Sequence, residues 1–113
     1  MSDSTRIKTK IPGPKSRALM KRKRRAVSRG WANAIPVFVK EARGALLTDV
    51  DGNTFIDFAG GIGAVNIGHA APRVVEAVRE QVGDLIHTAF QAVPYEPFVE
   101  LAEKLNALVP GEF

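Results

Sequence analysis

Residues 45–58 read Ala-Leu-Leu-Thr-Asp-Val-Asp-Gly-Asn-Thr-Phe-Ile-Asp-Phe, and this stretch decides the local fold. Two β-prone runs flank the Asp-Gly-Asn sequence at 51–53. Asp-Gly between such runs predicts a hairpin, because the turn needs positive φ angles that Gly, Asn and Asp tolerate. Residues 37–39, Val-Phe-Val, form a third β-prone run, and Ala-Arg-Gly at 42–44 can supply the preceding turn. We therefore predict a three-stranded antiparallel meander.

Helical periodicity predicts three helices around this meander. The first opens at Pro14 and stops before Gly30, since proline suits a first turn and glycine a C-terminal stop. The second opens at Pro72 and the third follows Pro97. Their faces at helical spacing are formed by Leu19, Met20, Lys23 and Val27, by Val74, Val75, Val78, Val82, Leu85 and Ile86, and by Phe98, Leu101, Ala102, Leu105 and Leu108. The predicted fold class is an α+β segment: an N-terminal helix, an antiparallel β-meander and two amphipathic helices.

Charge divides the 113-residue chain into two parts. Residues 1–30 hold eleven Lys or Arg and one acidic residue, whereas residues 31–113 hold five Lys or Arg and eleven acidic residues. We predict a basic N-terminal arm and helix over 1–30 and an acidic body over 31–113. An acidic body argues against a nucleic-acid-binding face there, and the basic run at 21–25 contains no aromatic residue on which bases could stack. We expect no nucleic-acid partner.

Other compositional features exclude several classes of protein. The chain has no cysteine, which removes disulfides, thiolate zinc sites and cysteine nucleophiles. No apolar run approaches the roughly 18 residues of a membrane span, and no apolar segment follows the basic N-terminus as in a secretory signal. These features fit a cytoplasmic protein without a membrane partner. Residues 1–13 are polar, and we expect them to lack regular structure.

The glycine-rich stretch 59–69 could let the backbone approach a ligand closely. It is not a phosphate-binding Walker loop, because no Gly-Lys-Ser/Thr follows. It is not a dinucleotide-binding fingerprint either, because Asn66 stands where the third glycine is required. Without further context the stretch predicts a structural turn.

The titratable residues near the hairpin form no metal-ligand pattern. His69 and His87 lie far apart, and we expect structural roles for both, with His69 bonded to backbone. Asp51 is explained by the turn. Asp49 and Asp57 are expected to be solvated or bonded to backbone rather than to act as a general acid and base.

The order of the motifs is more specific than any one of them. The segments concerned are 49–53, 55–62, Asn66-Ile67-Gly68-His69, Pro72, Ala77-Val78 and Gln81. This series resembles the start of class III aminotransferases. The segments His87-Thr88, Phe90-Gln91, 94–97 and 109–111 are similar to the 4-aminobutyrate branch. The resemblance covers nearly the whole chain from Ile11 onward.

The resemblance implies the N-terminal part of a fold-type I transferase dependent on pyridoxal 5′-phosphate, with residues 31–113 in its small domain. It implies transfer of the amino group of 4-aminobutyrate to 2-oxoglutarate, giving succinate semialdehyde and glutamate. The cofactor is an electron sink, held in this family on a lysine. A cytosolic homodimer or larger assembly is implied as well. Because the cofactor-holding groups of the family lie beyond Phe113, we expect a fragment that is truncated before the cofactor-binding domain and inactive alone.

Two substrate-binding residues are carried over from the 4-aminobutyrate branch. Ile62 would line the substrate pocket, and Gln91 could offer its amide to a substrate carboxylate. We expect no catalytic, cofactor-binding or metal-binding residue in this chain. Two alternatives stay open: another class III enzyme, acting on ornithine or 5-aminovalerate, and a non-enzymatic small module with a basic nucleic-acid-binding arm.

Overall fold

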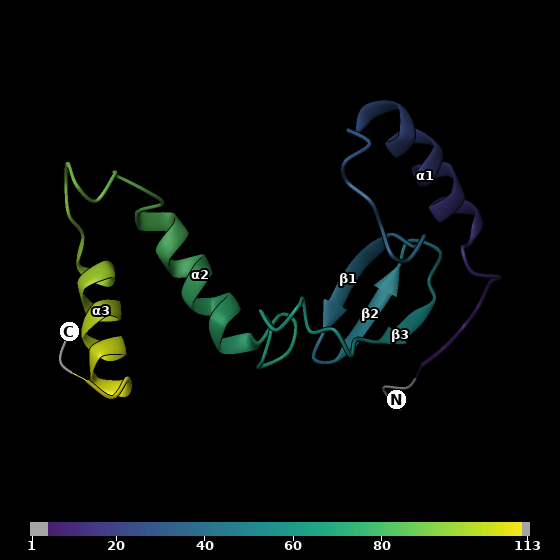
Figure 1. Ribbon diagram of the computed structural model, residues 1–113. Coiled ribbons are helices and arrows are strands. Elements are labelled where there is room, and N and C mark those ends of the chain that lie inside the picture. Colours follow the sequence, from purple (N-terminus) through teal and green to yellow (C-terminus); the bar gives the residue numbers. More distant parts are fainter. Residues whose placement is uncertain (1–4, 112–113) are drawn as a thin grey trace. The chain divides into compact units, whose positions relative to one another are not determined.

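The computed structural model describes residues 5–111 (Figure 1). Its elements in chain order are α1 (Pro14–Ala26), β1 (Val39–Arg43), β2 (Leu46–Asp49), β3 (Thr54–Ile56), α2 (Pro72–Asp84) and α3 (Glu96–Leu108). The strands form one antiparallel sheet in the order β1-β2-β3. The predicted helices and meander are therefore confirmed, and the fold is an α+β segment. Within the described range no helix has the length and apolar character needed to cross a membrane.

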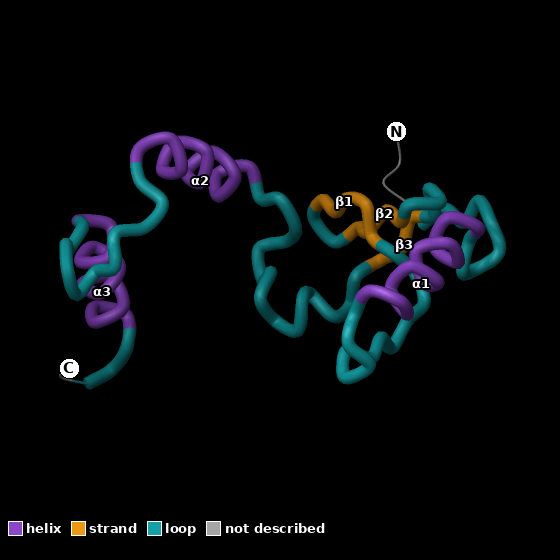
Figure 2. The backbone as a smooth tube through the Cα atoms, turned by 90° about the horizontal axis from the view of Figure 1, so that it is seen from above, coloured by secondary structure: helices purple, strands orange, loops and turns teal. Residues whose placement is uncertain are grey.

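The described chain divides after Val74 into two units. The first contains α1, the sheet and the glycine-rich loop that Figure 2 draws in teal between β3 and α2. The second contains α3 and all but the first residues of α2.

The first strand lies later in the chain than its composition predicts. β1 begins at Val39 and continues to Arg43, which pairs with Leu46 of β2. The predicted strand at 37–39 and the predicted turn at 42–44 are therefore wrong. Strand propensity is weak compared with cross-strand pairing, so pairing with β2 draws polar residues into β1. The chain turns after Arg43 at Gly44, whose φ of 54° lies in the left-handed region that glycine adopts freely.

The hairpin between β2 and β3 uses one left-handed residue rather than two. Gly52 has φ of 82°, and its N–H donates to the Asp49 carbonyl at 3.0 Å. The Asp49 N–H donates to the carbonyl of Asn53 at 2.9 Å and closes the loop. Glycine in the left-handed position of a short hairpin loop matches the twist of the strands. The predicted hairpin is confirmed. Asn53, however, is not a left-handed turn residue; its side chain binds the N-terminal segment instead.

Polar side chains occupy the centre of the first unit. Asn53 is 0% exposed and Asp49 is 1% exposed, whereas no apolar residue among 5–111 is buried. The Asp49 carboxylate accepts the N–H groups of Asp51 and Asn53 at 2.9 and 2.8 Å, and the Asn53 side-chain amide at 2.8 Å. The Asn53 side-chain oxygen accepts the N–H groups of Lys8 and Thr9 at 2.8 and 3.0 Å. The base of the hairpin thus holds the N-terminal segment.

The segment that precedes α1 is consequently ordered. Arg6 and Thr54 exchange backbone hydrogen bonds of 3.2 and 2.8 Å, so this segment lies along β3. As expected, residues 5–13 form no helix or strand, although hydrogen bonds to Asn53 and Thr54 hold them in place. Residues 1–4 lie outside the described range. The polar composition of this segment gives no sign of its attachment, because its hydrogen-bond partner is an asparagine 44 or 45 positions away.

The helix α1 receives its N-terminal cap from the hairpin. The Asp51 carboxylate accepts the N–H groups of Lys15 and Ser16 at 2.8 and 2.9 Å. These are N–H groups of the first turn, which have no partner inside the helix. The N-cap residue Gly13 offers no side chain, and a Cβ placed on it would overlap the Asp51 carboxylate. The prediction that Asp51 is a turn residue was therefore incomplete.

This cap lowers the pKa of Asp51. Burial raises the pKa of the carboxyl, but the N–H groups of Ser16 and Lys15 and the Lys15 charge favour the ionised form and prevail. A carboxyl with a lowered pKa stabilises the fold above its ordinary pKa, and the stabilisation disappears as pH falls through the lowered value.

The helices of the second unit carry apolar stripes that no other described residue covers fully. On α2, Val74, Val78 and Val82 are 49–59% exposed. On α3, Phe98, Leu101 and Leu105 are 48–55% exposed. Amphipathic helices of this length depend on packing for their stability, so these stripes need a covering surface.

We predict that the N-terminus of α1 loosens as pH falls through the lowered pKa of Asp51, below the pH at which an ordinary aspartate takes up a proton. NMR chemical shifts and amide exchange at Lys15 and Ser16 would follow this loosening. The Asp51→Asn variant keeps an acceptor oxygen but does not titrate, so its helix N-terminus should not respond in that range. An identical acid response in both proteins would contradict the assigned cap.

We also predict that residues 1–113, prepared as an isolated chain, associate with themselves and melt without a sharp transition. The physical reason is the exposure of the α2 and α3 stripes together with the absence of buried apolar residues in 5–111. Light scattering coupled to gel filtration and calorimetry would measure both properties. A monomer with a cooperative heat-absorption peak would contradict the prediction.

Candidate functional site

The loop between β3 and α2, residues 57–71, is built from left-handed residues. The residues concerned, with their φ angles, are Gly60 (52°), Gly61 (61°), Ile62 (58°), Gly63 (81°), Gly68 (87°) and Ala70 (49°). Short backbone hydrogen bonds hold the coil, including Ile62 N–H to the Ala59 carbonyl at 2.8 Å and Val65 N–H to the Gly60 carbonyl at 3.0 Å. The glycine richness of the sequence is explained by this geometry, which most residues adopt at a cost.

Ile62 and Ala70 are the two residues of this set that are not glycine, and Ile62 is the β-branched one. A β-branched residue in the left-handed region is a strained conformation, and strained residues of this kind cluster at functional sites. Its side chain is 97% exposed in the described chain, so packing against its own segment does not repay the strain. The loop therefore presents an isoleucine outward at the position that the sequence resemblance assigned to the substrate pocket.

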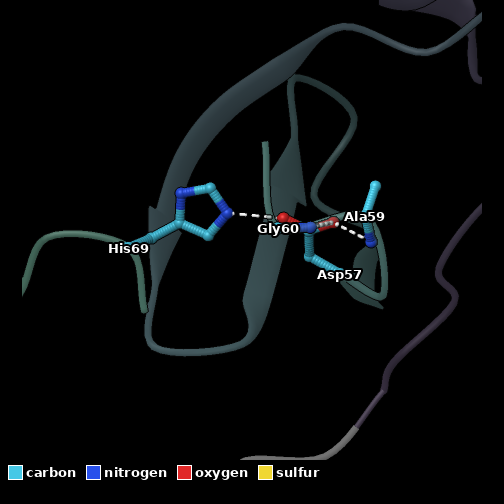
Figure 3. Close-up of polar contacts among 4 residues, drawn as sticks. All are labelled: Asp57, Ala59, Gly60 and His69. Carbon is cyan, nitrogen blue, oxygen red and sulfur yellow. Dashed lines mark hydrogen bonds and ion pairs between the residues drawn. The ribbon is translucent and has the colours of Figure 1, made fainter. Parts of the chain in front are cut away.

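Both ends of the loop are tied by Asp57 and His69 (Figure 3). One Asp57 oxygen accepts the N–H groups of Ala59 and Gly60 at 2.9 and 3.0 Å, and the other lies 2.6 Å from Nε2 of His69. The backbone of His69 also exchanges hydrogen bonds of 2.9 and 2.8 Å with Gly44, beside the β1–β2 turn. The ring of His69 thus binds a carboxylate, whereas the sequence predicted a bond to backbone.

These contacts keep Asp57 ionised. The hydrogen bond from His69 lowers its pKa, burial raises it by less, and the N–H groups of Gly60 and Ala59 lower it further. The net pKa lies below that of an ordinary aspartate. An ionised carboxylate only accepts hydrogen bonds, so His69 donates through Nε2. The pair ties the two ends of the loop together, and the expected backbone bonds of Asp57 are present.

Gln91 lies in the second unit, between α2 and α3. Its loop turns at Ala89, whose φ is 52° and whose carbonyl accepts the N–H groups of Ala92 and Val93 at 2.8 and 3.2 Å. The side chain of Gln91 is exposed. The fold therefore places Ile62 and Gln91 in different units.

Aromatic rings pack around the Gln91 loop. The Phe90 ring stacks on Phe98 of α3 at a centroid distance of 4.1 Å and meets Tyr95 edge-on at 5.5 Å. Offset and edge-on pairs of this kind add to the stabilisation from buried area. The residue before Gln91 is thereby anchored on α3, while the side chain of Gln91 itself is exposed.

The basic run of α1 lies beside Trp31, which follows it by six residues in the sequence. An open groove of about 540 Å³ is lined by Met20, Lys23, Arg24, Val27, Ser28, Arg29, Trp31, Asn33 and Pro36. Trp31 is 73% exposed there. Sequence reasoning found no aromatic residue within 21–25, and the chain reversal after α1 brings one alongside. In the described range no group of three His, Cys, Asp or Glu side chains could hold a metal ion.

Comparison with known proteins identifies the family. The family model for class-III aminotransferases matches residues 27–113. A 4-aminobutyrate aminotransferase of Mycobacterium tuberculosis is 49% identical over 98% of this chain and 25% of its own length. A 5-aminovalerate aminotransferase of Pseudomonas putida is 51% identical over 85% of this chain and 23% of its own length.

Solved structures agree with the sequence relatives. An omega-transaminase from Sphaerobacter thermophilus superposes with a TM-score of 0.76 and 33% identity, over 88% of this chain and 24% of that one. The chain belongs to the class-III aminotransferases, the family that its motif order resembled. It spans about a quarter of the length of the curated relatives it matches.

The strain at Ile62 predicts an unusual stability order. In the complete protein that contains this chain, the Ile62→Gly variant should be about 0.5 to 1 kcal/mol more stable than Ile62→Ala. Alanine keeps the free-energy penalty of the left-handed conformation, whereas glycine does not. The flexibility that glycine adds to the unfolded chain offsets part of this gain. Chemical denaturation of both variants measures the difference. At an unstrained position the order reverses, so a more stable alanine variant would argue against strain.

Proposed function

We propose that the complete protein containing this chain is a transaminase dependent on pyridoxal 5′-phosphate that moves the amino group of 4-aminobutyrate to 2-oxoglutarate. The products are succinate semialdehyde and glutamate. The observation that carries the proposal is the 49% identity to a 4-aminobutyrate aminotransferase over nearly the whole chain. Membership of the class-III family, whose members are pyridoxal-phosphate-dependent, supports the reaction type.

The glycine-rich loop fits the aliphatic part of such a substrate. 4-Aminobutyrate has an unbranched chain of CH₂ groups between its amine and its carboxylate. The exposed Ile62 offers an apolar wall to those groups, and such a contact is favourable in proportion to the area removed from water. The Gln91 side-chain amide would donate to the substrate carboxylate. An apolar wall of the kind that Ile62 offers suits a short amino acid without an α-substituent.

The cofactor requires other groups than this loop provides. When bound, pyridoxal phosphate supplies an electron sink for the amino-group transfer. Residues 58–68 contain no lysine, so the loop does not offer the amine that would hold the aldehyde of the cofactor. We assign the loop to the wall of the substrate pocket and assign no cofactor-holding residue to this chain.

The exposed stripes of α2 and α3 support an assembled enzyme. Such faces are covered in stable proteins by further chain or by a second subunit, and most oligomers of this kind are symmetric. We place residues 31–113 in the small domain of a homodimer or larger assembly, with residues 1–30 as its basic arm. Its partners are then a small amino donor and a 2-oxo acid acceptor in the cytoplasm.

The principal alternative donor is 5-aminovalerate, which is longer by one CH₂ group. The Pseudomonas putida relative acts on it by name and is 51% identical, over 85% of this chain. One methylene changes specificity by only about ten- to two-hundredfold even in a closely fitting pocket. Specificity constants for both donors in the complete protein decide between them, and absence of transamination with either would refute the proposed function.

We predict that Ile62→Tyr lowers kcat/KM for 4-aminobutyrate by about ten- to a hundredfold, because added bulk and an unpaired hydroxyl against an apolar chain cost roughly 1 to 3 kcal/mol. Steady-state kinetics with 4-aminobutyrate and with glutamate as donors would measure the change, and glutamate should lose less.

The matched control is Ile67→Tyr, which makes the same change at a 73% exposed residue of the same loop. This control should change the two specificity constants by less than Ile62→Tyr does. Equal losses with both donors in Ile62→Tyr, or no loss with 4-aminobutyrate, would make Ile62 a structural loop residue.

A further inference from the structure

Backbone hydrogen bonds shape the glycine-rich loop, but its side chains pack little around the exposed Ile62. Gly60, Gly61 and Gly63 surround Ile62, and glycine adopts many backbone conformations at similar energy. A Cβ added at Gly63 would meet nothing within 4 Å, so packing leaves this part of the loop unconstrained. A side chain that selects a substrate must be held to within about 0.5 Å. The backbone hydrogen bonds within 59–65 shape the coil, and contacts at its ends fix it relative to the sheet.

Asp57 and His69 supply that restraint from the two ends. They are 12 positions apart, yet Nε2 of His69 and a carboxylate oxygen of Asp57 lie 2.6 Å apart. The other carboxylate oxygen binds the N–H groups of Ala59 and Gly60, which begin the coil. The two side chains are mostly shielded, with relative exposures of 9% and 21%. Ile62 lies between the two tied ends.

The His69 end is fixed independently of the loop. Its backbone N–H and carbonyl both bind Gly44, at the turn between β1 and β2. A Cβ at the adjacent Gly68 would stand 3.0 Å from the Gly44 backbone, so the two segments pack closely. The backbone of Asp57 is attached to the same turn, because its N–H donates to the Ala45 carbonyl at 2.8 Å. The ring of His69 therefore fixes the Asp57 carboxylate, which in turn binds the start of the coil.

We propose that the Asp57–His69 pair is a positioning device that sets the conformation of residues 58–68 and thereby the discrimination between amino donors by Ile62. The donor part of this inference rests on the proposed transaminase function. Neither residue needs to touch the substrate. The pair acts through Ile62, and its removal should alter the choice of donor before it alters the fold.

The experiment compares His69→Phe with His69→Gln in the complete protein that contains this chain. Phenylalanine keeps a planar ring but has no donor, whereas glutamine retains an N–H that can reach the Asp57 carboxylate. The measurements are hydrogen–deuterium exchange of peptides from 57–69 and the ratio of kcat/KM for 4-aminobutyrate to that for 5-aminovalerate. The control is His87→Phe, the same change at a histidine in the second unit whose Nε2 accepts the nearby Ala89 N–H at 3.1 Å.

In His69→Phe we expect exchange in the loop to accelerate about two- to tenfold, the range for loss of one hydrogen bond, and the donor ratio to change by a similar factor. In His69→Gln both should return toward the wild-type values, and in His87→Phe loop exchange should stay unchanged. Should the phenylalanine disturb folding, as thermal melting would show, His69→Leu removes the same donor with a smaller side chain.

Unchanged loop exchange in His69→Phe would overturn the proposal, whatever the enzyme's activity. Faster exchange with an unchanged donor ratio would overturn it as well, because the loop conformation would then not select the donor. A wild-type protein that transaminates neither donor would refute the proposed function itself and with it the donor part. The exchange data would in that case still decide whether the pair holds the loop.

Discussion

The first unit depends on the buried pair of Asp49 and Asn53. A polar side chain removed from water is costly unless its hydrogen bonds are made, and both residues make theirs with the hairpin and the N-terminal segment. Because no apolar residue of the described chain is buried, this polar cluster takes the place of a hydrophobic core. Loss of one member would leave the other buried without its partner, which makes the cluster cooperative.

The hairpin therefore organises more of the chain than its length suggests. Asn53 receives the N-terminal segment, and Asp51 in the same turn caps α1. Asp57, just after β3, starts the coil of the glycine-rich loop. Hydrogen bonds from the hairpin and the residue that follows it thus position a helix, an extended segment and the candidate substrate loop. The sheet supports the loop, and the loop contains Ile62 in its strained left-handed conformation.

The family assignment and the surface of the chain are consistent with each other. Class-III aminotransferases are much longer than the region matched here, and the α2 and α3 stripes are exposed when these residues stand alone. Faces of that kind acquire their energetic role only when something covers them. The same argument applies to Ile62. Its conformation costs free energy and projects its side chain outward, and such a conformation persists when another surface contacts that side chain.

The sequence by itself determined the element types, the α+β class, the hairpin and the family, because periodicity, turn residues and motif order are local or linear signals. It also placed the glycine-rich loop, but could not show that Ile62 is left-handed. Only the tertiary structure decided the start of β1, the order of residues 5–13, the α1 cap from Asp51 and the pairing of Asp57 with His69. Each of these is a contact between residues distant in sequence. A carboxylate or an amide accepts from any N–H that comes within reach, so its partner is selected by the fold and leaves no spacing in the sequence by which to recognise it.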